Sequence, residues 1–338
     1  MTMTDRPLIA ALRDVETLPL PAFDTEAAEA ARARQLELTK PPGSLGRLEE
    51  LAEFLAGWRG QARPVIDRAQ ALVFAGNHGV CAQGVNPFPQ EVTAQMVANF
   101  ERGGAAINQL CKLNGAALSV VALELDRPTR DFTAAPAMDE AETLDALQRG
   151  ADAVDPQADV LILGEMGIGN STVAAALAHA VFGGAARDWV GRGTGSDTAA
   201  IAHKAEVVSR AVAQHSGVSG IGLLAALGGR EQAAICGAVL AARLARIPVL
   251  LDGFICTAAV APLHAARPEL LDHCLIGHAS AEPGHRGMTS AMGKRPILDL
   301  GMALGEGSGA ALALGVLRGA LACHNGMATF AEAGVAGT

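Results

Sequence analysis

Six short apolar runs recur through the chain, and each is followed by glycine and then by a helical pattern of apolar residues. Runs that are apolar throughout and separated by helices are typical of a parallel sheet buried on both faces. The pattern therefore predicts an α/β fold with a parallel six-stranded sheet and helices on both faces. The runs are ALVFAG (71–76), ALSVVALEL (117–125), DVLILGEMG (159–167), IPVLLDGF (247–254), HCLIGHAS (273–280) and ILDLGMAL (297–304).

The first 60 residues have a different pattern, in which apolar residues recur at helical spacing. Leu45, Leu48, Leu51 and Leu55 lie on one helix face after a Pro-Pro-Gly break. We expect these helices to join the C-terminal helix in a small helical domain. The predicted boundaries are 1–65 and 320–338 for the small domain and 66–319 for the large α/β domain.

Polar side chains follow the apolar runs, where the strands of the predicted sheet end. Ligands of such sheets bind beyond the carboxyl ends of the strands. We therefore expect these polar side chains to converge on one cleft. They are Asn77, His78, Glu165, Asp252, His278, Ser280 and Glu306.

The stretch GEMGIGNSTVAAAL (164–177) is a predicted strand–loop–helix junction. Gly167 and Gly169 allow a ligand to approach the backbone, and Ser171 or Thr172 can cap a helix whose free N–H groups bind an anion. A glycine turn that only packs is the alternative. Glu165 favours a ligand site, because a packing turn needs no acid.

A second glycine loop, GRGTGSDTAAIAHK (191–204), also enters a predicted helix. Gly193, Thr194 and Gly195 can form a backbone nest for phosphate, and Lys204 can add a positive charge. A solvated lysine on a surface helix is the alternative.

Two other stretches leave several roles open. His78 in AGNHGV (75–80) is a ligand, a base or a hydrogen-bonded turn residue, and Phe88 and Met96 form either an apolar wall or part of the core. The histidines of GHASAEPGHRGM (277–288) lack the spacing of a zinc helix, which favours a polar loop and no metal site.

Composition narrows the class of partner. The net charge is −9, no basic stripe is visible, and only eleven residues are aromatic, which argues against nucleic acid. The chain shows neither a signal peptide nor a long apolar span, so no membrane partner is expected. Its six cysteines form no CxxC pair, which is typical of a reducing cytoplasm.

Eight motifs together resemble the nicotinate-nucleotide:dimethylbenzimidazole phosphoribosyltransferase family, in family order over about residues 10–325. They are KPPGSLGRLE (40–49), AGNHGV, PQEVTAQMVANF (89–100), GEMGIGNST, GRGTG, DGFICTAAV (252–260), SAEPGH (280–285) and LGEGSGAALA. One departure is Asn77, where many members have Asp.

The resemblance implies a Rossmann-like sheet, a small domain built from both termini and a homodimer in which the neighbour helps to close each site. It implies transfer of phosphoribose from nicotinate mononucleotide to 5,6-dimethylbenzimidazole, which gives α-ribazole 5′-phosphate and nicotinate in cobalamin assembly. It also implies that no metal or redox cofactor takes part. A nucleosidase acting on the same donor and a non-catalytic nucleotide sensor are the alternatives.

Glu306 in LGEG is the general base that the resemblance implies. Its apolar surroundings raise the pKa of a carboxyl, whereas the helix that follows it lowers that pKa. Glu165 is expected near the ribose and the pyridine ring of the donor, as a secondary catalytic residue. The predicted substrate-binding residues are Gly167, Gly169, Asn170, Ser171, Gly193, Thr194, Gly195, Lys204, Phe88, Met96, Ser280 and Leu304.

Overall fold

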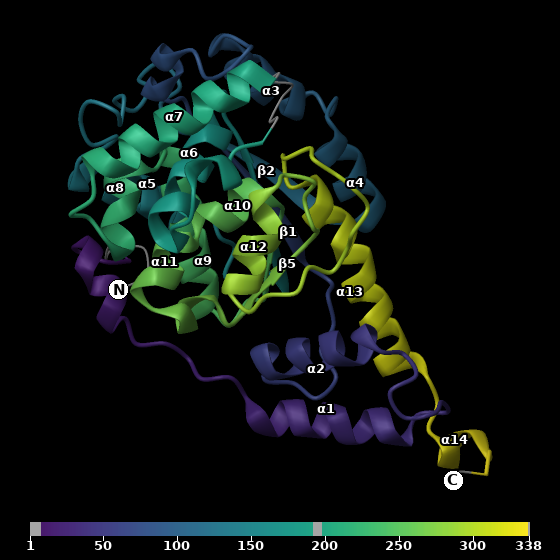
Figure 1. Cartoon of the computed structure of the whole chain (residues 1–338). Helices are drawn as coiled ribbons and strands as arrows, with labels where there is room; N and C mark the ends of the chain where they lie inside the picture. The colour runs from purple at the N-terminus through teal and green to yellow at the C-terminus, as the bar shows by residue number, and fades with distance from the viewer. Residues whose placement is uncertain (1–7, 192–197, 337–338) are drawn as a thin grey trace.

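A five-stranded parallel sheet lies at the centre of the computed structural model, which describes residues 8–191 and 198–336 (Figure 1). The strand order is β2-β1-β3-β4-β5. Because β2 lies on one side of β1 and the later strands lie on the other, the connections diverge between β1 and β3. That divergence leaves a crevice at the carboxyl ends of these strands. The strands are β1 (Ala69–Ala75), β2 (Ala116–Ala122), β3 (Val160–Met166), β4 (Val249–Leu251) and β5 (Cys274–Ile276).

Helices fill most of the remaining chain. The α-helices are α1 (Thr25–Glu37), α2 (Arg47–Arg59), α3 (Glu91–Glu101), α4 (Ala106–Asn114), α5 (Glu140–Asp152), α6 (Asn170–Phe182), α7 (Thr198–Gln214), α8 (Leu223–Leu227), α9 (Arg230–Leu244), α10 (Phe254–Ala259), α11 (Ala261–Ala266), α12 (Gly284–Ala291), α13 (Ser308–Gly326) and α14 (Phe330–Ala333). Short 3₁₀ helices are η2 (Leu12–Thr17), η3 (Gly79–Gln83), η4 (Ala186–Asp188), η5 (Gly220–Gly222) and η6 (Pro268–Leu271).

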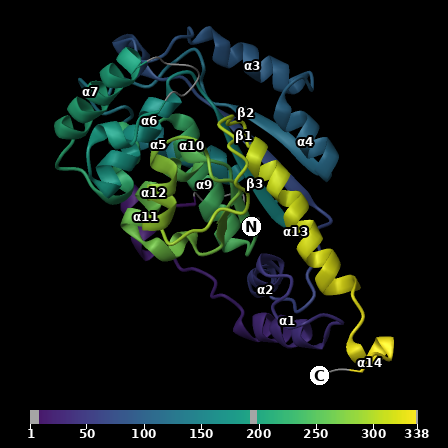
Figure 2. The ribbon, with the colours of Figure 1, turned by 45° about the vertical axis from the view of Figure 1, so that its right-hand side comes forward.

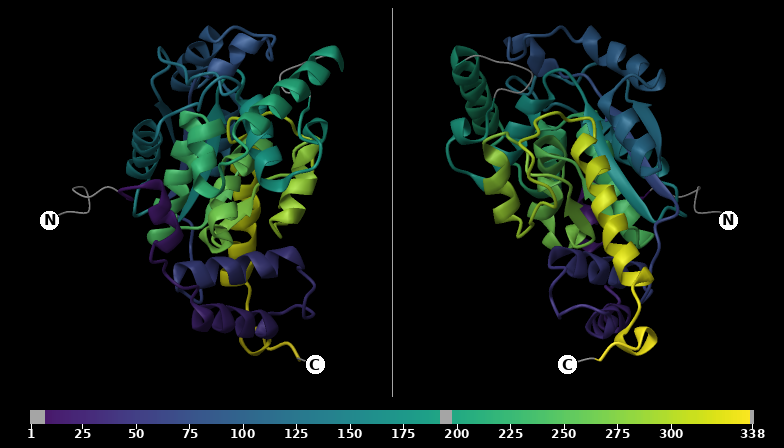
Figure 3. Two further views of the ribbon diagram at one scale, coloured as in Figure 1. Left: turned by 60° about the vertical axis from the view of Figure 1, so that its left-hand side comes forward. Right: turned by 90° about the vertical axis from the view of Figure 1, so that its right-hand side faces the viewer.

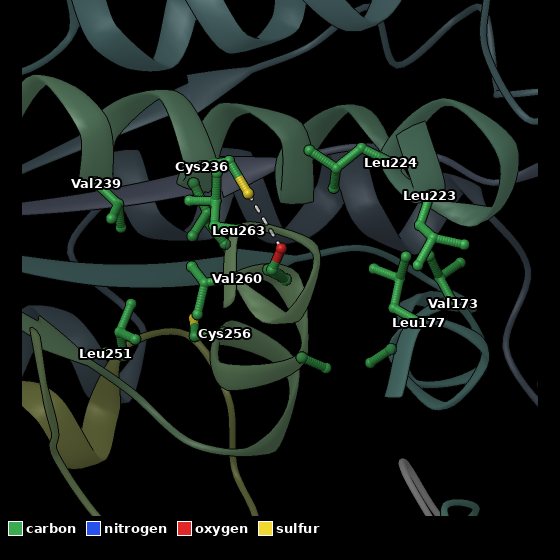
Figure 4. Close-up of a cluster of buried hydrophobic side chains, with 14 of the residues drawn as sticks. Val173, Leu177, Leu223, Leu224, Cys236, Val239, Leu251, Cys256, Val260 and Leu263 are labelled. Carbon is green, nitrogen blue, oxygen red and sulfur yellow. Dashed lines mark hydrogen bonds between the residues drawn. The ribbon is translucent and has the colours of Figure 1, made fainter. Parts of the chain in front are cut away.

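The sheet separates two apolar cores, because successive strand residues point to opposite faces. Leu72 and Phe74 of β1 pack with α5, α6 and α9, whereas Ala71 and Val73 pack with α2, α4 and α13. Figure 4 shows part of the first core, where side chains of α6, α8, α9, α10 and α11 meet β4. The alternation confirms that helices cover both faces of a parallel sheet.

The sixth apolar run, 297–304, forms no strand in the described part of the chain, so the prediction of six strands was wrong. Leu298 pairs with His278 through a single parallel bridge. Beyond it the chain turns at Gly301, whose φ is +66°, and the Leu300 side chain points out of the fold with 61% exposure. An apolar run that borders a cavity therefore has the same pattern as a buried strand.

Helices α1 and α2 meet the C-terminal part of α13 on one side of the molecule. The helices α1 and α2 lie beside the far end of α13 in every view (Figure 3). Arg34 of α1 donates hydrogen bonds to the carbonyls of His324 and Met327, and Gln35 bonds the His324 ring over 2.8 Å. In Figure 2 helix α13 connects this region with the sheet.

The contact between α5 and α9 is close because each helix presents a glycine to the other. A Cβ at Gly237 would lie 1.7 Å from the Leu147 carbonyl oxygen, and one at Gly150 would lie 1.9 Å from that of Ala234.

We predict that Gly237→Ala lowers the free energy of unfolding by at least about 2 kcal/mol, because the backbones must separate. Gly319→Ala in α13 is the control, since its Cβ would meet nothing within 4 Å. That change should stabilise the helix by about 0.5–1 kcal/mol. Urea unfolding of both variants checks the pair, and equal changes would contradict the close contact.

Candidate active site

A cavity of about 420 Å³ opens at the carboxyl ends of the strands. Segments that follow β1, β3, β4 and β5 line it, together with residues 303–306 before α13. The site therefore lies where the divergence of β1 and β3 leads one to expect it.

Glu165 lies near the end of β3 and is 4% exposed. The Asn170 side chain and the backbone N–H of Glu306 donate hydrogen bonds to its carboxylate. Burial, followed by the charges of Asp252 and Glu231, raises the pKa of Glu165 to about 8. The site thus contains a carboxyl group that gains or loses a proton near neutral pH.

Asp252 follows β4 directly and accepts two backbone hydrogen bonds from the start of α13. Gly307 N–H donates to Oδ2 over 3.1 Å, and Ala310 N–H donates to Oδ1 over 2.9 Å. Burial raises the pKa of Asp252 to about 7, although these N–H groups oppose the shift. Asp252 thereby fixes the first turn of α13 to the sheet.

Glu306 lies in the turn before α13 with a φ of +70°, a conformation that is uncommon for a residue with a Cβ. The turn packs so closely on β3 that a Cβ at Gly164 would lie 2.3 Å from the Glu306 carbonyl oxygen. Among the described residues, Oε2 of Glu306 has no hydrogen-bond partner. Burial raises the pKa of Glu306, and a hydrogen bond from the Ile107 N–H partly offsets the rise.

Lys204 of α7 supplies a buried positive charge at the cavity. It is 3% exposed, and its Nζ donates to Ser171 Oγ over 3.2 Å. Burial lowers the pKa of Lys204, whereas the charge of Glu282 raises it. The lysine is therefore held against the first turn of α6 and is not solvated, which resolves the alternative that the sequence left open.

Both predicted catalytic residues and most of the predicted substrate-binding residues line this one cavity. They are Glu165, Gly167, Gly169, Asn170, Ser171, Lys204, Phe88, Met96, Ser280, Leu304 and Glu306. Phe88 and Leu304 are 45% and 50% exposed, so they form the outer part of its wall. Gly193, Thr194 and Gly195 lie outside the described residues.

Several lining residues were not among those predicted to bind substrate. Asp252 and His278 follow apolar runs and had that signal. The only signal for Val92, Ile255 and Glu282 was that they lie within the motifs PQEVTAQMVANF, DGFICTAAV and SAEPGH. The predicted polar loop 277–288 does supply part of the cavity wall, but His285 points to Thr257 and to the Ser280 N–H.

The two polar residues after β1 do not reach the cavity. Asn77 donates to the Leu125 carbonyl over 2.9 Å. His78 is fully buried, and its Nε2 lies 2.9 Å from Glu231 Oε1. His78 is therefore neither a cavity ligand nor a base within the cavity.

The described part of the chain contains no cluster of three or more His, Cys, Asp or Glu residues arranged to hold a metal ion. Within the same residues, no helix combines the length and apolar character needed to cross a membrane.

Comparison with known proteins shows the family. A family model described as phosphoribosyltransferase matches residues 20–335. The nicotinate-nucleotide–dimethylbenzimidazole phosphoribosyltransferase of Rhodobacter capsulatus is 66% identical over 316 residues, which cover 94% of this chain and 95% of that protein. The chain belongs to the nicotinate-nucleotide–dimethylbenzimidazole phosphoribosyltransferase family.

More distant members agree with this assignment to the phosphoribosyltransferases. The protein of that name from Novosphingobium aromaticivorans is 59% identical and covers 94% of each chain. The crystal structure of the Thermus thermophilus enzyme has 41% identity and a TM-score of 0.86 over 93% of this chain and all of that one. Because the chain belongs to an enzyme family, the alternative of a non-catalytic nucleotide sensor is not supported.

The raised pKa of Glu165 has a consequence for the stability of the phosphoribosyltransferase. A carboxyl whose pKa is higher in the folded state than in the unfolded state stabilises the fold less as pH rises through that interval. For Glu165 the interval runs from its ordinary value of 4.5 to about 8.

We predict that Glu165→Gln becomes progressively more stable than the wild type between pH 5 and pH 8.5, because the amide never carries the buried charge. Thermal unfolding without substrates at both pH values measures the difference. Glu29→Gln, on the exposed face of α1, is the control and should show no such trend. A difference between Glu165→Gln and wild type that stays constant with pH would refute the shift.

Proposed function

We propose that the protein transfers the 5-phosphoribosyl group of nicotinate mononucleotide to 5,6-dimethylbenzimidazole, in the assembly of the cobalamin nucleotide loop. The products are α-ribazole 5′-phosphate and nicotinate. The observation that carries the mechanism is the buried Glu306 carboxylate, whose Oε2 has no partner among the described residues and which lines a cavity with an apolar outer wall.

Glu306 is the general base of this proposal. The acceptor ring attacks C1′ through one nitrogen, and the bond from C1′ to the pyridinium nitrogen breaks. Its electron pair leaves with nicotinate, so the leaving group needs no proton. The opposite N–H of the acceptor becomes acidic as the new bond forms, and the Glu306 carboxylate takes that proton. Positioned bases of this kind contribute about 10²–10⁴-fold.

Glu165 and Asp252 provide the negative charge on the side of the cavity where the donor binds. The pyridinium ring carries a positive charge, which moves partly onto the ribose as the bond breaks. Since the pKa values of Glu165 and Asp252 are raised to about 8 and about 7, these carboxyls are ionised at the upper end of the neutral range, and there they stabilise such a charge more strongly than water does. Lys204 and the glycine loops at 167–171 and 193–195 bind the anionic groups of the donor, which are a phosphate and a carboxylate.

The outer wall suits a flat apolar acceptor. Phe88, Met96 and Leu304 line the cavity and offer no hydrogen-bonding side chain to a water molecule. This favours a benzimidazole over water as acceptor. Incubation with donor alone tests the nucleosidase alternative, which requires nicotinate release at the full rate without any base.

The assembly and the domain organisation also belong to this proposal. The proposed small helical domain is 1–65 and 320–338, and the contacts of Arg34 and Gln35 with the end of α13 support it for α1. Ile9, Leu12 and Val15 pack instead in the core of the large domain. Exposed Phe88 and Leu304, which line the cavity, support a homodimer in which a second copy covers the site. The enzyme works in the cytoplasm. Light scattering of the purified chain tests the dimer.

Lys204→Ala should raise the KM for nicotinate mononucleotide far more than the KM for the base. The loss of a charged hydrogen bond corresponds to about 1.5–3 kcal/mol. Lys112→Ala, at an exposed position of α4, is the matched control and should leave both constants unchanged. Equal effects of Lys204→Ala on the two substrates would contradict the assignment to the donor.

Glu306→Gln should lower kcat by at least about 100-fold, because the amide cannot accept the proton. Donor binding should survive. The kcat of Glu306→Asp should lie between those of Glu306→Gln and the wild type, because its carboxylate is withdrawn by one methylene. Steady-state kinetics together with donor calorimetry make the comparison, and a Gln variant with near-normal kcat would show that water takes the proton.

Donor affinity should rise with pH and level off above about pH 8, because the pyridinium binds best when Glu165 is ionised. Calorimetry with donor alone, between pH 6 and pH 9, measures the rise. Comparison with Glu165→Gln removes the donor's own titration, and this variant should lack the upper step. If donor affinity depends on pH in the same way in the wild type and in Glu165→Gln, the proposal that ionised Glu165 binds the pyridinium is wrong.

A further inference from the structure

His78 and Glu231 form a buried pair directly behind the wall of the cavity. His78 follows β1, and Glu231 lies in the first turn of α9. Both side chains are fully buried, and Nε2 of His78 lies 2.9 Å from Oε1 of Glu231. Neither the His78 ring nor the Glu231 carboxylate has a partner of hydrogen-bond geometry among the described residues, so their contact with each other is what offsets the cost of burying them.

Three glycines leave room for the pair. A Cβ at Gly76 would lie 2.3 Å from Glu231 Oε2, and one at Gly229 would lie 2.4 Å from His78 Cε1. A Cβ at Gly167 would lie 2.9 Å from His78 Nε2. Since Gly167 lines the cavity, the pair touches the back of the loop that forms its wall.

The neighbours of His78 hold the same loop, residues 167–170. Thr93 Oγ1 accepts a hydrogen bond from the Ile168 N–H over 3.1 Å, and Cys81 Sγ donates to the Ile168 carbonyl over 3.2 Å. The Gln90 side chain in turn donates to the His78 carbonyl. The segment that follows β1 thus supports the loop from behind, and the His78–Glu231 pair ties this segment to α9.

Glu231 also acts on Glu165 through its charge. The groups that face Glu165 are Asp252 after β4, Glu231 on α9, Asn170 on α6, Cys256 on α10 and the Glu306 N–H before α13. Burial raises the pKa of Glu165 most, and Asp252 and Glu231 both add to the rise. Asp252 lines the cavity, whereas Glu231 lies behind its wall.

We propose that His78 and Glu231 are positioning residues for the donor nucleotide, which hold loop 167–170 against the cavity and set the charge beside Glu165. This inference rests on the proposed function for the identity of the donor. Neither side chain touches the reacting atoms.

Four single variants test the pair in the full-length protein: Glu231→Gln, His78→Gln, His78→Ala and, as the control, His324→Gln. Glutamine at position 78 reaches about as far as Nε2 and keeps a donor for Glu231, whereas alanine does not. His324 is equally buried but bonds Gln35 and the Ala62 carbonyl at the far end of α13.

The first readout is donor calorimetry as a function of pH. Glu231→Gln should move the titration step assigned to Glu165 to lower pH, because one negative charge is removed. His78→Ala should weaken donor binding by about 10-fold or more. This is the effect expected when the displaced loop 167–170 loses one hydrogen bond to a charged group of the donor. His78→Gln should recover part of that loss, and His324→Gln should change neither quantity.

The second readout is hydrogen exchange of the Ile168 amide, which needs no substrate. Exchange should speed up in His78→Ala and in Glu231→Gln, and it should stay at the wild-type rate in His324→Gln. If His78→Ala fails to fold, Glu231→Gln and His78→Gln still decide the matter.

The inference is overturned if Glu231→Gln leaves both the pH step and the Ile168 exchange unchanged, or if His324→Gln has the same effects. A wild type that makes no ribosylated base would refute the proposed function. The exchange result would still decide whether the pair supports the loop.

Discussion

The two backbone hydrogen bonds that Asp252 accepts from α13 are the contact on which the site depends. They join the carboxyl end of β4 to the first turn of the helix and leave Glu306 just before it. Gly164 allows the same turn to approach β3. Together these contacts keep Glu306 in a left-handed conformation that a residue with a Cβ seldom adopts. The general base proposed here is thus positioned by the Asp252 side chain, which follows β4, and by close packing against the backbone of β3.

The site stores electrostatic free energy in the folded state. Glu165, Asp252 and Glu231 are all at most 4% exposed, and the first two have raised pKa values because of burial and because of neighbouring carboxylates. A cationic substrate relieves that repulsion, whereas a neutral one does not. The arrangement makes the unoccupied site costly and the occupied site favourable, as expected for a preorganised anionic pocket.

Much of this arrangement could be predicted from the sequence, since the signals were local. An acid or a glycine directly after an apolar run indicated strand ends, and this rule placed Glu165 and Gly167 at the cavity. Glu306 also lines the cavity, but the apolar run before it is not a strand. The rule failed for 297–304, because residues that border a cavity are as apolar as a strand. It also failed for His78, whose partner Glu231 lies about 150 positions further along the chain, a separation that no local pattern reports.

Helix α13 has a mechanical consequence. It has 19 residues and therefore forms a rod of about 28 Å. One end follows Glu306, and the other is clasped by Arg34 and Gln35 of α1. The same rod thus joins the contact between α1 and the C-terminal region to the turn that contains Glu306, and the Asp252 hydrogen bonds fix its first turn to the sheet. The chain after α13 extends away from the cavity (Figure 2), so a change there meets the helix at the end opposite Glu306.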